Sequence, residues 1–88
     1  MAWEVATLAD LKNARQAMVD NNSFTGESDH GVTRSIYGQD PDGIEFELMW
    51  EVPLELLDEG VQVQTTKLDL EADIAKFGAD TPGRGAKP

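Results

Sequence analysis

The sequence contains no cysteine and only one histidine, which excludes a disulfide framework and any metal site built from thiolates. It also has no long uncharged apolar stretch, and its N-terminus lacks the apolar segment of a signal peptide. These absences predict a soluble cytoplasmic protein that has no membrane among its partners.

Basic residues are scarce as well, since 7 lysines and arginines stand against 17 aspartates and glutamates, for a formal net charge of −10. Such a chain repels phosphate backbones and anionic lipids, so we expect no nucleic acid partner. A hydrophobic content of 40% is typical of a folded protein, and 88 residues suffice for one small domain with a modest core. Most of the acidic residues are expected to serve solubility alone.

Hydrophobic periodicity in residues 1–53 predicts one helix and four strands. The helix shows apolar residues at helical spacing after Thr7, which is placed as its N-cap with Asp10 three positions on. β-branched and aromatic residues indicate the strands. This order predicts an α+β fold, namely a single βαβββ module with a four-stranded mixed sheet. The expected elements are a strand at 2–5, the helix at 8–19, and strands at 23–27, 32–38 and 44–51.

The pattern changes after Pro53. Residues 54–78 are expected to form a C-terminal extension with a short helix at 69–77 that Gly78 caps. Residues 79–88 are rich in glycine, proline and alanine and have no periodicity, so we expect a disordered tail. The sequence thus divides into a module at 1–53, an extension at 54–78 and a tail at 79–88.

The most informative stretch is Y-G-Q-D-P-D-G-I-E-F-E-L at residues 37–48. Pro41 fixes its own φ and Gly43 tolerates a positive φ, so D-P-D-G predicts a tight turn between two strands. In the strand after the turn, apolar residues alternate with Glu45 and Glu47, which is the period of a half-buried strand. One face of that strand must pack, and the other can present a carboxylate to a cavity.

This stretch, with S-D-H-G-V-T-R-S-I-Y in front of it, resembles the vicinal oxygen chelate superfamily. That superfamily includes glyoxalase I, bleomycin-resistance proteins and type I extradiol dioxygenases. The similarity is greatest to the C-terminal βαβββ half of small catechol 2,3-dioxygenase-like members, with the signature D-H-x-V-S-x-x-[LI]-Y-x-x-D-P-D-G-N-x-[IV]-E-L. Here Thr33 replaces the serine, and Ile44 stands where the signature has asparagine.

The resemblance implies a cup formed by two βαβββ modules, in which histidine and carboxylate ligands hold Fe(II) or Mn(II). Glu47 matches the carboxylate that binds the metal, and Tyr37 matches a tyrosine that hydrogen-bonds to a bound catecholate. His30 lies where some relatives have a histidine that acts as an acid or base near the substrate. Simpler roles stay open for all three: an exposed glutamate, an aromatic residue packed on a strand, and a histidine at a turn or pocket rim.

The first strand departs from the family pattern. Relatives have H-x-A-[FW]-E-V there, whereas this chain begins M-A-W-E-V, so the ligand histidine would fall before Met1. One histidine cannot complete a site of two histidines and one carboxylate within one chain. Three interpretations stay open: a fragment of a longer two-module enzyme, a single module that pairs with a second copy, and a binding module that has lost the metal.

The leading hypothesis is a ring-cleaving extradiol dioxygenase-like protein, or the C-terminal fragment of one, that binds a divalent metal and a catechol-type substrate in the sheet cup. The alternative is a non-catalytic dimeric module that binds a small aromatic or other hydrophobic ligand, with Trp3, Met49 and Trp50 as candidate walls; in that case the chain carries no metal. A homodimer is expected because a lone four-stranded sheet leaves its concave face bare, and a second copy would complete a cup-shaped barrel.

Overall fold

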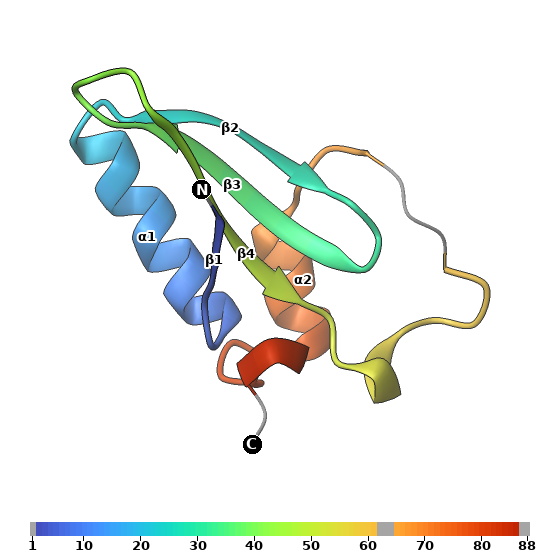
Figure 1. Cartoon of the computed structure of the whole chain (residues 1–88). Helices are drawn as coiled ribbons and strands as arrows, with labels where there is room; N and C mark the ends of the chain where they lie inside the picture. The colour runs from blue at the N-terminus through green and yellow to red at the C-terminus, as the bar shows by residue number, and fades with distance from the viewer. Residues whose placement is uncertain (1, 62–64, 87–88) are drawn as a thin grey trace.

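The computed structural model describes residues 2–61 and 65–86 as an α+β fold with one four-stranded mixed sheet and two α-helices (Figure 1). The βαβββ order predicted from periodicity is therefore confirmed, and each predicted boundary lies within two residues of the observed one. The elements are β1 (Ala2–Glu4), α1 (Leu8–Asp20), β2 (Phe24–Asp29), β3 (Thr33–Gln39), β4 (Glu45–Glu51) and α2 (Leu70–Phe77), with short 3-10 helices η1 (Leu54–Leu56) and η2 (Arg84–Ala86).

The strands lie in the order β1-β4-β3-β2, so the first and last strands of the module are neighbours. β1 runs parallel to β4, and the other two pairs are antiparallel. The sheet is open, with β1 at one edge and β2 at the other. At the β2 edge, Thr66 forms an isolated antiparallel bridge with Asp29.

The turn between β3 and β4 has the geometry that D-P-D-G predicts. The Asp40 carboxylate accepts hydrogen bonds from the backbone N–H groups of Asp42 and Ile44, each at 2.9 Å. Gly43 has a φ of 87°, which glycine adopts without steric cost. The turn therefore fixes the register in which β3 and β4 pair.

Helix α1 begins as the sequence predicts, because the Thr7 hydroxyl accepts a hydrogen bond from the Asp10 N–H at 3.1 Å. Its apolar stripe, formed by Leu8, Leu11 and Met18, is buried. Both helices lie against the same side of the sheet in Figure 1, so the core forms between the helices and that face. The core residues are Leu8, Leu11, Met18, Ile36, Trp50, Val52, Leu68, Leu70 and Phe77.

Residues after Pro53 belong to this same core. The Asp69 side chain caps α2 by accepting from the Ala72 N–H at 3.1 Å, and Leu70 and Phe77 of the helix are buried. The helix is also joined to the sheet by an ion pair between Arg34 and Asp73, at 3.0 Å. The extension expected at 54–78 thus shares one core with the module at 1–53.

The segment expected to be a disordered tail has specific contacts over residues 79–86, whereas residues 87–88 lie outside the described part. The Ala79 carbonyl accepts from the Ala9 N–H at 2.9 Å, and the Gly83 N–H donates to the Ala6 carbonyl at 2.7 Å. The Trp50 indole N–H donates to the Thr81 carbonyl at 3.1 Å. These partners lie far away in sequence, which is why local composition gave no sign of them.

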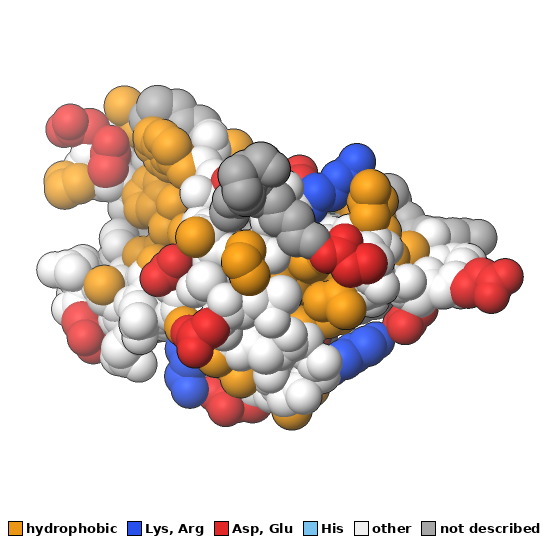
Figure 2. Space-filling model, turned by 90° about the horizontal axis from the view of Figure 1, so that it is seen from below, with side chains coloured by type: hydrophobic (Ala, Val, Ile, Leu, Met, Phe, Trp, Pro, Cys, Tyr) orange, Lys and Arg blue, Asp and Glu red, His pale blue; other side chains and the backbone are white. Residues whose placement is uncertain are grey.

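Among the described residues, neither helix combines the length and the apolar character that crossing a bilayer requires. The surface view in Figure 2 shows acidic side chains dispersed among apolar ones and basic side chains at a few separate points. The excess of acidic over basic residues in the sequence is therefore visible on the face shown in Figure 2.

Candidate functional site

The face of the sheet opposite the helices carries the polar residues of the two central strands apart from Arg34. Because side chains alternate along a strand, Arg34 and Ile36 of β3 point toward the helices, and Ser35 and Tyr37 point away. In β4 the same alternation places Glu45, Glu47, Met49 and Glu51 on the face without helices. We call this surface the open face.

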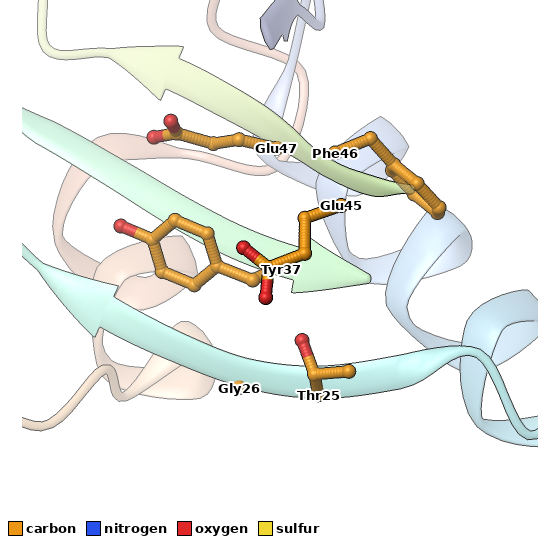
Figure 3. A pocket seen from close by; sticks show the side chains of 6 residues that line it. All are labelled: Thr25, Gly26, Tyr37, Glu45, Phe46 and Glu47. Carbon is orange, nitrogen blue, oxygen red and sulfur yellow. The ribbon is translucent and has the colours of Figure 1, made fainter. Parts of the chain in front are cut away.

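The open face contains a cavity of about 510 Å³. Figure 3 shows the Tyr37 ring extending along β3, with the Glu47 side chain above it and the Glu45 carboxylate beside its backbone end, both from β4, and Thr25 below it from β2. Phe46 lines the rim from the other side of β4. The lining residues are Thr25, Gly26, Tyr37, Glu45, Phe46 and Glu47.

Strand register explains why the face is hollow at this point. Tyr37 pairs with Glu47 on one side and with Gly26 on the other, and Glu47 in turn pairs with Ala2 of β1. The row across the sheet therefore has two large side chains at its centre and the two smallest residue types at its ends. A methyl group added at Gly26 would meet no atom within 4 Å apart from those of its two chain neighbours. The absent side chain of Gly26 leaves open space beside the tyrosine.

The structure brings together Tyr37 and His30, two of the three site residues predicted from the resemblance. The His30 Nε2 atom lies 2.7 Å from the Tyr37 hydroxyl. The two rings are nearly perpendicular, with an interplanar angle of 82°. The second ring nitrogen of His30 lies 3.5 Å from the Thr65 hydroxyl. His30 thus holds the tyrosine at its hydroxyl end, outside the set of residues that line the cavity.

Glu47, the third predicted residue, is directly opposite Tyr37 in the register and lines the same cavity. Sequence reasoning did not single out Glu45, Thr25 or Gly26. The alternation in β4 could have indicated Glu45, since it lies two residues from Glu47 on the same side. Gly26 was visible only as an interruption of a strand, and its place beside Tyr37 depends on a register that the sequence does not reveal.

The donor set for the implied Fe(II) or Mn(II) does not fit one copy of the chain. Within residues 2–61 and 65–86, no group of three or more histidine, cysteine, aspartate or glutamate side chains is placed to hold a metal ion. Glu47 has Glu45 near it, but the Nε2 atom of His30 is engaged by the Tyr37 hydroxyl. One chain therefore offers carboxylate oxygens on the open face without the imidazole ligands of the implied site.

A second and smaller cavity, of about 120 Å³, lies on the helix side of the sheet beside α2. Its two basic side chains already have acidic partners, because Arg34 pairs with Asp29 and Asp73 and Lys76 pairs with Asp58. Arg34 and Lys76 therefore form ion pairs within the protein, and these pairs account for the basic side chains of this cavity.

Trp50, expected as a candidate wall of a ligand cup, is fully buried on the helix side, where its ring centroid lies 5.5 Å from that of Phe77. Trp3 pairs in register with Leu48, and its ring lies edge-on to Phe46 at 6.4 Å. It is 50% exposed at the β1 edge. Of the three proposed walls, only Met49 lies on the open face.

No protein-family model matches the chain, and no curated protein or solved structure matches it either. The class that the structure itself defines is a small α+β protein with an open four-stranded mixed sheet.

Proposed function

We propose that this protein is a small-molecule-binding module whose ligand lies on the open face of the sheet, between Tyr37 and Glu47. The observation that carries the proposal is the cavity of about 510 Å³, which falls within the range of small-ligand sites. It is built on strands, with a tyrosine whose orientation is fixed by His30. Rigid elements and a fixed aromatic ring are what a preformed binding site requires.

The proposal can be tested with three small aromatic probes, catechol, benzyl alcohol and benzylamine, by ligand-observed NMR. We expect at least one of them to bind with a dissociation constant on the order of 1 mM, which is ordinary for a ligand of this size. Gly26→Val should abolish that binding, because its side chain would occupy the space beside Tyr37.

The matched control is Ser28→Val, which adds the same side chain to the same strand and the same face but outside the cavity lining. Ser28→Val should bind the probe as the unmodified protein does. Equal binding by Gly26→Val, or the absence of binding by all three probes, would contradict the proposal.

A second candidate function is metal-dependent ring cleavage of a catechol, as the resemblance to extradiol dioxygenases implies. It is favoured by one observation, the placement of Tyr37 with His30 at its hydroxyl and Glu47 opposite its ring. The described residues of one chain do not form a complete set of metal ligands. This candidate therefore needs further ligands, which a symmetric pair of copies or a preceding module would have to supply.

Native mass spectrometry after anaerobic loading with Fe(II) tests the second candidate. Ring cleavage requires one bound metal ion per site, and this ion should be lost in Glu47→Gln. The control is Glu51→Gln, which removes the same charge from the same face of β4 but outside the cavity, and it should keep the metal. A metal-free protein, or equal loss of metal in both variants, would leave only the binding function.

We also propose that two copies pair through the β1 edges of their sheets and so bring two open faces into one cup. The three residues of β1 are all exposed, and β1 has a neighbouring strand on one side only. An exposed edge strand can add a further strand through its free backbone groups. The same native mass spectra would show such a pair at twice the chain mass of 9.6 kDa.

A further inference from the structure

The strand residues of the open face carry charge of one sign. β4 places Glu45, Glu47 and Glu51 there by alternation, and two of these three carboxylates line the cavity. The only basic residue in any of the four strands is Arg34, which points to the helix side and is 7% exposed. No lysine or arginine side chain contributes to the described cavity lining.

Tyr37 offers this cavity its ring more than its hydroxyl. The hydroxyl is 2.7 Å from His30 Nε2, at the end of the ring farthest from the Glu45 carboxylate (Figure 3). With the hydroxyl engaged, the ring is left as the surface that a ligand meets between β4 and β2. A tyrosine ring carries partial negative charge on its faces and attracts cations within about 6 Å of its centroid.

From the aromatic ring, the two carboxylates and the space at Gly26, we infer that the ligand of this cavity is a small organic cation, a protonated amine on a compact apolar body. The ammonium group donates hydrogen bonds to the Glu45 and Glu47 carboxylates, and its charge also interacts with the Tyr37 ring. The apolar body occupies the open space beside Gly26. This inference rests on the proposed binding function of the open face and specifies its ligand class.

An anionic ligand meets the opposite situation. A carboxylate or catecholate would approach two glutamates without a lysine, arginine or assembled metal site in the described cavity to offset the repulsion. Like charges at contact distance disfavour binding even in water, and more so where solvent is displaced. The charge of this face therefore selects a different ligand from the metal-bound catecholate that the sequence resemblance implies.

The test compares three probes that share one ring and differ in charge: benzylamine, benzyl alcohol and benzoate. Isothermal titration at pH 7 and low ionic strength should give benzylamine at least about tenfold tighter binding than benzyl alcohol, with benzoate weakest. Raising the salt to about 0.5 M should reduce the preference, since screening weakens exposed charge pairs.

Variants locate the source of the preference. Glu45→Gln and Glu47→Gln should each weaken benzylamine about three- to tenfold and leave benzyl alcohol nearly unchanged, because each removes a charge and keeps the shape. Glu51→Gln is the matched control on the same strand and face, and it should alter benzylamine binding by less than about twofold. Circular dichroism of each variant confirms that it is folded.

The outcomes separate the ligand class from the binding function. If benzyl alcohol or benzoate binds as tightly as benzylamine and Gly26→Val abolishes that binding, the inferred class is wrong and the cavity is still a binding site. If benzoate or catechol binds tightly only after Mn(II) is added, the inference is overturned in favour of the metal-dependent candidate. If no probe binds, both the class and the proposed function fail.

Discussion

At the residue scale, Arg34 is the second residue of β3, and its guanidinium lies among three acceptors. It pairs with Asp73 at 3.0 Å and Asp29 at 3.3 Å, and it donates to the Gly31 carbonyl at 2.7 Å. Alternation in the sequence places Arg34 on the same face as Ile36, where a buried cation needs partners. Asp73 lies 39 residues away on α2, so the partner could not be predicted without the tertiary fold.

Arg34→Met should destabilise the protein by about 3–5 kcal/mol, because it leaves the buried Asp73 carboxylate and the partly buried Asp29 carboxylate without their counter-ion. The double variant Arg34→Met with Asp73→Leu should recover much of that loss, since the carboxylate buried against α2 is then gone as well. Urea denaturation followed by circular dichroism measures both.

The exposed ion pair between Lys76 and Asp58 provides the comparison, and Lys76→Met should cost no more than about 1 kcal/mol. If Arg34→Met and Lys76→Met have similar effects, the buried network does not hold α2 on the sheet as the structure indicates.

Two strand glycines differ in what a side chain would meet. A methyl group at Gly38 would lie 2.5 Å from the Met18 terminal carbon and 2.6 Å from the Phe46 ring, whereas one at Gly26 would meet nothing within 4 Å. Gly38→Ala should therefore lose about 1–3 kcal/mol of stability. Gly26→Ala should be neutral or slightly stabilising, because alanine restricts the unfolded chain more than glycine does.

Thermal unfolding of both alanine variants measures this difference. Equal melting temperatures for the two variants would show that Met18 and Phe46 do not pack closely against Gly38, which would contradict the structure. The comparison also supports the ligand experiments, since it tests whether Gly26 tolerates a side chain without loss of the fold.

At the element scale, periodicity predicted the helices and strands well because each carries its own local pattern. α1 has a cap and an apolar stripe, and the β3–β4 hairpin has D-P-D-G between alternating strands. The segment at 79–86 has no such pattern, and its structure depends on contacts with Ala6, Ala9 and Trp50. Elements held by distant partners are the ones that local sequence does not predict.

Gly83 is the residue through which this C-terminal segment approaches the core. A methyl group there would lie 2.9 Å from Trp50 Cδ1 and 3.1 Å from the Glu51 carbonyl oxygen. Gly83→Ala should destabilise the protein by about 1–3 kcal/mol and expose Trp50 to water, because the segment must move away from the indole. Pro82→Ala, at an exposed neighbouring position, should leave both properties unchanged.

The readout is tryptophan fluorescence in a Trp3→Phe background, in which Trp50 is the only tryptophan. A red shift of the native emission in Gly83→Ala is expected, with none in Pro82→Ala. An unshifted spectrum and unchanged stability in Gly83→Ala would mean that residues 79–86 do not cover Trp50 in solution.

At the scale of the whole molecule, the sequence predicted the fold class and the face on which the candidate residues lie. It predicted a cavity on that face but not its position or its full lining, because the hollow arises from the pairing of Tyr37 with Gly26 and Glu47 across three strands. The resemblance to vicinal oxygen chelate proteins indicated three residues that share a region of one face. The charge of that face then points to a ligand different from the one the resemblance implies.

The net charge of −10 governs how two copies can meet. Pairing through β1 edges brings the glutamates of two open faces toward one another, so we expect the dimer fraction to rise between about 0.02 and 0.5 M salt as this repulsion is screened. Sedimentation velocity across that range measures the fraction. A single species at the chain mass under all conditions would contradict the proposed pairing.

The central claim is that the open face between Tyr37 and Glu47 binds a small molecule. The most direct measurement is the change in backbone amide ¹H–¹⁵N chemical shifts when benzylamine, benzyl alcohol or catechol is added. We expect shifts centred on Gly26, Tyr37 and Glu47 that are retained in Ser28→Val and lost in Gly26→Val. Shifts confined to the α2 side, around Arg34 and Lys76, or no shifts with any probe, would contradict the claim.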